Sequence, residues 1–324
     1  MRTKGFAALF CLSAALASLC LGAAALSPGQ LLQALLSGPG STAGRIFWYV
    51  RLPRTAGCLL AGAALSVAGC VIQNVLCNPL ASPNIIGINA GAGLAVTVCC
   101  AAGWLSGWVL AGAAFGGAFL AVLAVSGVSR LVGASRTTVI LSGVAVNAFL
   151  GAISDAVTNL VPDAAALSSD FRVGGFGGVV PARLVPAGIL IVLALGTVLL
   201  MGNELEILSL GEDTARSLGL NAGRMRTVFL GLSAVLCGAA VSFAGLLGFV
   251  GLIVPHAVRR FAGTKCTRLL PLCALWGGAF VTVCDLVSRL AFRPRELPVG
   301  ILLSALGGPF FLYILAKGGV GHHD

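Results

Sequence analysis

Charged residues are scarce in this chain: only 9% of its 324 residues are Asp, Glu, Lys or Arg, whereas 58% are hydrophobic. A soluble domain of this length needs a more highly charged surface, so the composition excludes a soluble fold. The apolar runs also lack the period-two alternation of membrane-barrel strands. The remaining class is an all-α polytopic membrane protein, in which each spanning helix needs about 20 apolar residues.

Residues that catalyse reactions or bind metals are also scarce. The chain has three histidines, two of them at His322 and His323, and it contains no G-x-S-x-G, H-E-x-x-H or Walker A sequence. None of its 11 cysteines forms a C-x-x-C pair, so we interpret them as small apolar packing residues. We therefore expect no catalytic residue, no metal site and no cofactor on this chain, and ATP with its magnesium would bind to another chain.

The apolar stretches predict about ten transmembrane helices in a single domain that covers residues 1–324. The eighth is short for a membrane span, which suggests that it is tilted, broken or partly re-entrant. A cleavable signal peptide over residues 1–26 is an alternative for the first helix, because Arg2 and Lys4 precede an apolar stretch, and its removal would leave nine spans. The predicted helices are 5–26, 52–75, 85–103, 105–128, 137–160, 182–202, 226–244, 246–258, 269–291 and 297–316.

The net charge of +10 indicates membrane topology rather than nucleic-acid binding, because the 20 basic residues are scattered in short loops. With ten spans and a cytoplasmic N-terminus, both termini lie inside, and 12 of the 20 basic residues fall on the inside, as the positive-inside rule favours. The eight basic residues left outside are Arg45, Arg51, Arg54, Arg172, Arg183, Arg289, Arg293 and Arg295.

One segment of the chain occurs twice. GAALSVAG at Gly62–Gly69 returns as GAAVSFAG at Gly238–Gly245, and at the same offset of 176 residues Pro79 matches Pro255. The offset covers five predicted spans, and five is odd, so the second copy enters the membrane from the opposite side. The sequence therefore predicts an inverted five-plus-five repeat, with halves of about 1–180 and 181–324, as in transporters that open to alternate sides.

Three polar segments interrupt the apolar chain: 27–54 and 161–183 on the outside, and 203–226 on the inside. Leucines and charged residues alternate in the inside segment, which fits one or two short amphipathic helices at the membrane surface, punctuated by Gly211 and Gly219. Two small-residue patterns, GINAG (Gly87–Gly91) and GAAFG (Gly112–Gly116), predict close helix contacts rather than a ligand site.

Two acidic residues, Asp155 and Asp285, could lie within the membrane. Arg289 follows Asp285 by four residues, so we favour local charge pairing over a proton or sodium site. Prolines follow both repeat copies, where they either bend a helix or end it, and the sequence leaves both alternatives open. We place the helix bends and the translocation path at Gly69, Gln73, Asn78, Pro79, Gly245 and Pro255.

Arg51, Arg54 and Arg289 flank predicted spans at the outer face, where the positive-inside rule disfavours arginine. Exposed arginines form bidentate hydrogen bonds with carboxylates, so these three could align an acidic partner that docks from outside. Snorkelling of the side chains to the membrane interface is the alternative.

Four long blocks resemble the FecCD-type permeases, which import iron–siderophores, haem and cobalamin. They are RLPRTAGCLLAGAALSVAGCVIQNVLCNPLASPNIIGINAGAGLAV (Arg51–Val96), LSLGEDTARSLGLN (Leu208–Asn221), GFVGLIVPHAVRRFAGT (Gly248–Thr264) and ELPVGILLSALGGPFFLYIL (Glu296–Leu315). They span nearly the whole chain in the family's order, although only the GGFGG region resembles the family within Pro162–Pro181.

The resemblance implies a ten-helix subunit of a bacterial cytoplasmic membrane, in a homodimer or with a paralogue, with the substrate path between the subunits. Two ATPase subunits would dock from the cytoplasm and a substrate-binding protein from outside. On matching positions, Arg51, Arg54 and Arg289 would meet acids of the binding protein. The segment Leu208–Asn221 would sit in a groove of the ATPase, and its candidate coupling residues are Leu208, Gly211, Glu212, Ala215, Leu218 and Gly219.

The leading hypothesis is thus the membrane subunit of an ATP-driven importer, working by alternating access and not itself an enzyme. A secondary transporter coupled to an ion gradient is the main alternative, and a passive channel is a third. The inside segment 203–226 and the scarcity of acids within the spans favour the importer.

Overall fold

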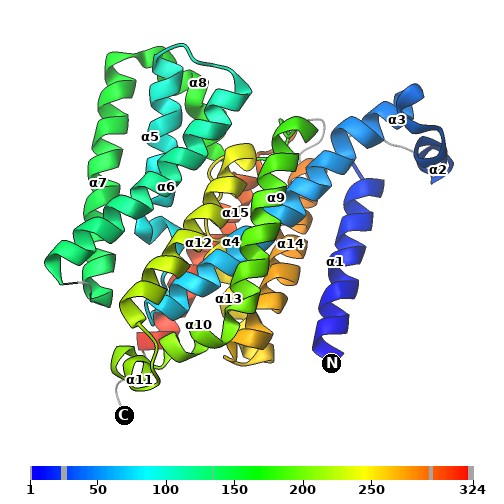
Figure 1. The fold of residues 1–324 in the computed structure, drawn as a ribbon. Coiled ribbons are helices and arrows are strands. Elements are labelled where there is room, and N and C mark those ends of the chain that lie inside the picture. Colours follow the sequence, from blue (N-terminus) through cyan, green and yellow to red (C-terminus); the bar gives the residue numbers. More distant parts are fainter. Residues whose placement is uncertain (1, 23–27, 134, 292–294, 320–324) are drawn as a thin grey trace.

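The computed structural model describes residues 2–22, 28–133, 135–291 and 295–319, and every regular element in these ranges is a helix (Figure 1). The basic residue Arg293 and the terminal His322 and His323 lie outside the described residues. The helices are α1 (Arg2–Cys20), α2 (Pro28–Ser37), α3 (Thr42–Ile46), α4 (Leu52–Val75), α5 (Ile88–Ala101), α6 (Gly107–Val132), α7 (Arg136–Leu160), α8 (Pro162–Val173), α9 (Pro181–Leu200), α10 (Gly202–Ser209), α11 (Glu212–Ser217), α12 (Ala222–Ala244), α13 (Val250–Ala262), α14 (Cys266–Leu290) and α15 (Val299–Gly319).

Seven helices among the described residues are long and apolar enough to cross a membrane, so this is a multi-span membrane protein. A helix overlaps each of the ten predicted ranges, and α4 has the predicted bounds. Three of these helices are shorter than a full span: the apolar part of α1 (Gly5–Cys20), α5 and the 13-residue α13. The count of ten spans therefore stays a prediction.

The polar segments contain more helix than the sequence predicts. Helix α3, a π-helical turn at Phe47–Arg51 (η2) and α4 form one continuous apolar helix from Thr42 to Val75. In the π turn the amide of Leu52 bonds to the carbonyl of Phe47, five residues back, and Pro53, which has no amide hydrogen to donate, follows in the first turn of α4. The predicted outer loop thus ends near Thr42 instead of Arg54.

The break before α13 falls later than the sequence predicts. The backbone of Gly245 has φ of 70° and that of Phe249 has φ of 64°, so α12 ends at Ala244 and α13 starts at Val250 instead of 246. Glycine adopts such left-handed backbone angles freely, whereas a phenylalanine there is uncommon. The segment between the two helices remains non-helical.

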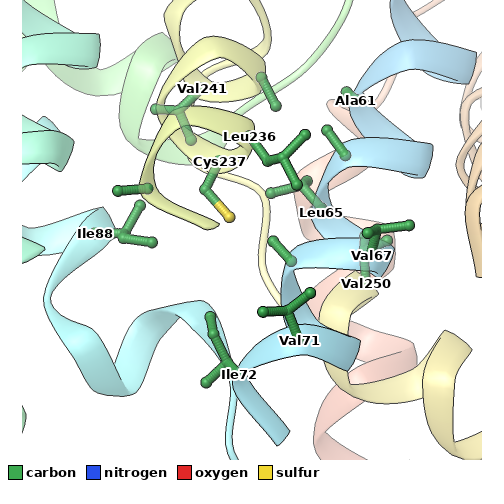
Figure 2. Close-up of a cluster of buried hydrophobic side chains, with 14 of the residues drawn as sticks. Ala61, Leu65, Val67, Val71, Ile72, Ile88, Leu236, Cys237, Val241 and Val250 are labelled. Carbon is green, nitrogen blue, oxygen red and sulfur yellow. The ribbon is translucent and has the colours of Figure 1, made fainter. Parts of the chain in front are cut away.

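Helix α4 runs through the centre of the bundle and packs against α12, α13 and α14. Figure 2 shows part of the apolar core, to which α4 contributes Leu65 and Val71, α12 contributes Leu236 and α13 contributes Val250. Close approach depends on glycine, because a Cβ added at Gly62 of α4 would collide with the backbone of Gly277 in α14. In membranes such small-residue contacts take the place of the hydrophobic effect between helices.

Of the two small-residue patterns, one contact is confirmed. Gly91 of α5 packs against the backbone of Gly117 in α6, as predicted for GINAG. The predicted helix contact at the two glycines of GAAFG is wrong, because nothing lies within 4 Å of a Cβ added at Gly112 or Gly116. The helix α6 uses the next glycine, Gly117, for the contact.

The two repeat copies lie in α4 and α12, which run antiparallel (Figure 1). At one end, which we call the Arg54 end, α4 begins and α12 finishes, with the amide of Gly175 bonding to the carbonyl of Ala244. At the other, the Glu212 end, Cys77 after α4 bonds to the carbonyl of Ser209 near α11. The inverted repeat predicts that α4 and α12 run in opposite directions, as they do. That each half of the repeat contains five spans remains a prediction.

Candidate functional site

The Arg54 end contains a cluster of charges, which we call the Asp285 cluster: Arg51, Arg54, Asp285 and Arg289, which are buried, and Glu296, which is exposed. Arg54 Nη2 lies 3.0 Å from Asp285 Oδ1, and Arg54 Nη1 lies 2.7 Å from Glu296 Oε2. Arg289 Nε lies 2.9 Å from Asp285 Oδ2. The predicted pairing of Asp285 with Arg289 is confirmed, and the carboxylate is shared between two guanidinium groups.

The cluster also ties α1 to the bundle. Arg51 Nη1 donates to the carbonyl oxygens of Leu19 and Cys20 at 2.7 and 2.8 Å, where the last turn of α1 leaves acceptors free. Arg289 Nη2 donates to Ser18 Oγ at 2.8 Å. A cation beside the C-terminal carbonyls of a helix is favourable because they carry partial negative charge.

The expectation that these arginines are exposed is wrong. Arg51, Arg54 and Arg289 are only 3%, 8% and 3% exposed, because each has partners within the chain. Snorkelling to the interface does not describe them either. Their docking role stays a prediction. To bind acids of a docking protein, these arginines would have to release the partners that they hold within the chain. By contrast, Asp155 of α7 is exposed and forms no ion pair among the described residues.

A hollow of about 320 Å³ opens beside this cluster. The glycine-rich segment 174–178 lines one side, and Arg54, Asp170 and Glu296 supply its charges. The backbones around it converge closely, since the amide of Gly300 donates to the carbonyl of Gly174 and the amide of Leu246 donates to the carbonyl of Phe171. The glycine-rich segment thus packs where α8, α12 and α15 meet.

At the Glu212 end, the segment that predicted one or two short helices forms two, α10 and α11. Gly211 and Gly219 have φ of 121° and 81°, which explains why glycine stands at these turns. Leu208 and Ala215 are buried, so these two predicted coupling residues hold the segment onto the bundle instead of facing outward. Leu210 and Leu218 are 62% and 60% exposed, which leaves an apolar outer surface around α11.

A salt bridge fixes α11 to the first turn of α12. Arg226 Nη2 lies 2.8 Å from Glu212 Oε2, and Arg216 Nη2 lies 2.9 Å from Glu212 Oε1. The hydrogen bond from Arg226 is the main reason that the pKa of Glu212 is lowered. Because Arg226 is buried, this bridge joins the segment to the interior of the bundle.

The predicted path residues lie mainly in the packed interior. Gly69, Gln73, Gly245 and Pro255 are buried, and a Cβ at Gly69 would collide with the backbone of Gly251 in α13. Burial in helix contacts does not support these residues as the lining of a path. For Pro79 the structure supports helix termination, because α4 ends at Val75 and the proline lies in the turn that follows.

Pro255, however, lies inside α13, and a side chain of α4 compensates for it. A proline cannot donate to the carbonyl four residues earlier, which is that of Gly251. Gln73 Nε2 donates to this carbonyl at 3.1 Å, and Gln73 Oε1 accepts from Arg259 Nη1. A backbone acceptor freed within a membrane needs such a partner. The residues Gln73 and Pro255 thus form one unit that joins α4 to α13.

Sequence analysis missed two adjoining hollows, which we call the Arg172 hollows. Their volumes are about 470 and 290 Å³, and both are lined by Asn89, Arg172 and Leu246. Ser304 of α15 lines the larger and Ser154 of α7 the smaller, where Arg172 Nη2 donates to Ser154 Oγ at 2.8 Å. Asparagines within the apolar run PNIIGINAG were the sequence signal that could have indicated them.

Comparison with known proteins agrees with this architecture. The chain is 38% identical to the uncharacterized ABC transporter permease protein YvrB of Bacillus subtilis (strain 168), over 84% of this chain and 79% of that protein. It is 36% identical to the vitamin B12 import system permease protein BtuC of Salmonella paratyphi A (strain ATCC 9150 / SARB42), over 95% of this chain and 93% of that protein.

Solved structures show the same fold. A transporter described as metal-chelate type, in an inward-facing conformation, superposes with a TM-score of 0.86 at 25% identity, over 98% of this chain and 99% of that chain. PsaBC from Streptococcus pneumoniae, solved with a Fab, gives a TM-score of 0.57 at 16% identity, over 80% of this chain and 88% of that chain, and so supports the fold alone. The model of the FecCD transport family matches residues 9–317, and the chain therefore belongs to that family, as an ABC transporter permease.

Proposed function

We propose that this chain is the membrane subunit of a binding-protein-dependent ABC importer in a bacterial cytoplasmic membrane, with both termini in the cytoplasm. Its cargo would be a metal chelate of the iron–siderophore, haem or cobalamin class. The observation that carries the proposal is the α10–α11 segment, held by the Glu212–Arg226 bridge and exposing Leu210 and Leu218. Since the sequence has no Walker A motif, a docked ATPase would supply the energy.

Two ATPase subunits would bind at the Glu212 end and move α11 when ATP closes them. A second permease subunit, identical or paralogous, would cover part of the exposed apolar surface of α7 and α15, where only 22% of the most apolar window is buried in each helix. Lipid would cover the remainder. The helices that line the path would then tilt to open it to alternate sides.

A binding protein would dock at the Arg54 end. Glu296 is the exposed member of the Asp285 cluster, with a side chain that is 38% exposed, and it holds Arg54 Nη1. A carboxylate of the docking protein could take the place of Glu296 on Arg54, which reconciles the burial of the arginine with the docking role that the resemblance implies. This exchange would link docking to the helices α4 and α14.

The Arg172 hollows are the part of the path where we expect cargo contact. They are bordered by the start of α5, the end of α8 and α15, and Arg172 is the only cation in their lining as described. Haem carries carboxylates and cobalamin carries a phosphate, and a guanidinium pairs well with either group. Arg172→Gln should slow uptake about tenfold for an anionic chelate, whereas Arg172→Lys should retain more activity. Equal uptake rates for all three proteins would contradict this role.

The decisive experiment is uptake by proteoliposomes that contain this chain with a companion ATPase and binding protein. Radiolabelled cyanocobalamin, a ferric siderophore and haem are tested in parallel, with ATP inside the vesicles. We expect uptake of one cargo that requires ATP and survives an ionophore. Uptake without the ATPase that collapses with the ionophore would support the secondary transporter instead. The buried Asp285 favours the importer, since two arginines already neutralise its carboxylate.

A further inference from the structure

A cleft at the Glu212 end shares only Arg226 with the residues of the transport proposal. The cleft has a volume of about 330 Å³ and lies between α6, α7 and α12. Three arginines line it, Arg130 from α6 and Arg224 and Arg226 from α12, together with Ser126 and Thr227. We propose that this cleft, which we call the Arg130 cleft, binds the phosphate of an anionic phospholipid.

The charge of the cleft is the first argument. Three of its lining residues are arginines and none is acidic, and Glu212 is already bonded to Arg226 and Arg216. Arg130 Nη2 donates to Thr227 Oγ1 at 2.8 Å, which holds the α6 arginine against α12. Arginines and hydroxyl groups that converge in this way are the usual donors to a phosphate.

The apolar surroundings identify a lipid as the source of that phosphate. Val139 of α7 and Leu230 of α12 also line the cleft. Beside Arg130, at the end of α6, Leu131 and Val132 are 89% and 70% exposed, so acyl chains can cover them. Basic pockets between membrane helices are known to hold anionic headgroups, which are concentrated on the cytoplasmic leaflet. A free phosphate would leave the apolar part of the cleft without a ligand.

A lipid bound in this cleft would also affect the position of α11. Arg226 lines the cleft and holds Glu212, so a bound headgroup shares one arginine with the segment that positions α11. The test therefore leaves Arg226 in place and changes Arg130 and Arg224, which are both exposed.

The test measures binding to the full chain, purified in mild detergent, by native mass spectrometry and by the rise in its unfolding temperature. Phosphatidylglycerol, phosphatidylcholine, inorganic phosphate and a polyglutamate peptide are compared at equal concentration. We expect phosphatidylglycerol alone to stabilise the protein. Stabilisation of the same size by inorganic phosphate, by phosphatidylcholine or by polyglutamate would overturn the proposal, since each indicates a different occupant.

Two variants locate the effect. Arg130→Gln with Arg224→Gln should weaken phosphatidylglycerol binding about tenfold or more, since each basic side chain near a membrane surface contributes substantially to binding an anionic lipid. Ser126→Trp keeps every charge and fills the cleft, and it should abolish the same adduct. The matched control, Arg260→Gln with Arg268→Gln, removes two exposed arginines of α13 and α14. If all variants bind the lipid equally, it associates with the surface in general and the cleft is not a site.

Discussion

At the scale of single residues, five charged side chains among the described residues are buried, and four of these belong to the Asp285 cluster. The Asp285 cluster shows the consequence: one carboxylate receives Arg54 and Arg289, and the arginines extend the contact to α1 and Glu296. A buried ion pair is not by itself strong evidence of stability, because desolvation offsets the attraction. Removal of one partner, however, leaves a buried charge without compensation.

Asp285→Asn should therefore destabilise the protein by about 3–5 kcal/mol, because two buried guanidinium groups lose their shared carboxylate. Denaturant unfolding in detergent, followed by tryptophan fluorescence, measures the change. Arg216→Gln is the control, since its partner Glu212 keeps Arg226 and the Arg216 side chain is 67% exposed. The control should change stability by about 1 kcal/mol or less. Similar losses in both variants would mean that the cluster is energetically an ordinary surface pair.

Residue identity alone predicted part of this site. The i,i+4 spacing of Asp285 and Arg289 predicted their pairing, because helix geometry brings such residues together. The partner Arg54 could not be predicted, since it lies 231 positions away and the contact depends on how α4 packs against α14. The same limit applies to Gln73, whose bond to the Gly251 carbonyl depends on the approach of α13.

At the scale of helices, the packing of α4 against α14 depends on reciprocal glycines. A Cβ at Gly62 would meet the backbone of Gly277, and a Cβ at Gly277 would meet the backbone of Gly62. Neither backbone can move aside without shifting a helix. Small residues thus determine how near the two helices lie, as is general in membrane bundles.

Gly62→Ala should cost about 1–3 kcal/mol, because the added methyl group forces α4 and α14 apart. Gly112→Ala is the matched control: it lies in α6, where a Cβ meets nothing within 4 Å. Alanine favours a helix over glycine by about 1 kcal/mol, so this control should be neutral or stabilising. The unfolding temperatures of the two variants check the difference, and a neutral Gly62→Ala would show that the helices can separate without loss.

The attachment of α11 to α12 should depend on pH. The pKa of Glu212 is lowered in the folded protein, chiefly by the hydrogen bond from Arg226. A lowered folded pKa means that the carboxylate stabilises the segment fully above the unfolded value of about 4.3. That contribution is lost as the pH falls through the lower folded pKa, when the carboxylate becomes protonated.

Hydrogen-exchange protection of the α11 amides, corrected for intrinsic rates, measures this loss. We expect protection in the native protein to fall as the pH drops below the ordinary glutamate pKa of about 4.3, because the lowered pKa of Glu212 keeps its carboxylate ionised down to that point. Glu212→Gln should show weaker protection that does not change over this range. Asp213→Asn is the control, because Asp213 forms no ion pair among the described residues. If Glu212→Gln lost protection with falling pH in the same way as the native protein, the transition would belong to another group.

At the scale of the whole molecule, sequence patterns predicted helix positions well because apolar length is a local property. Helices overlap all ten predicted ranges, and Gly211 and Gly219 punctuate α10 and α11 as expected. Sequence reasoning placed Arg51, Arg54 and Arg289 at the surface because it judged each by its neighbours in the chain, whereas their burial comes from α1 and α14. The Arg172 hollows were missed for the same reason, since α5, α7, α8 and α15 each contribute only one or two polar groups.

The orientation of the molecule can be tested through its two ends. Because α4 and α12 run antiparallel, the glycine-rich segment at the Arg54 end and α11 at the Glu212 end should lie on opposite sides of the membrane. Gly177→Cys and Ser217→Cys place an exposed thiol at each end, in a background where the exposed Cys20 and Cys77 are serine.

In intact spheroplasts a membrane-impermeant maleimide should label Gly177→Cys, and Ser217→Cys only after permeabilisation. The background without either thiol should remain nearly unlabelled, since eight of the remaining nine cysteines are buried. Labelling of both thiols from one side would refute the inverted arrangement, and with it the assignment of α11 to an ATPase in the cytoplasm.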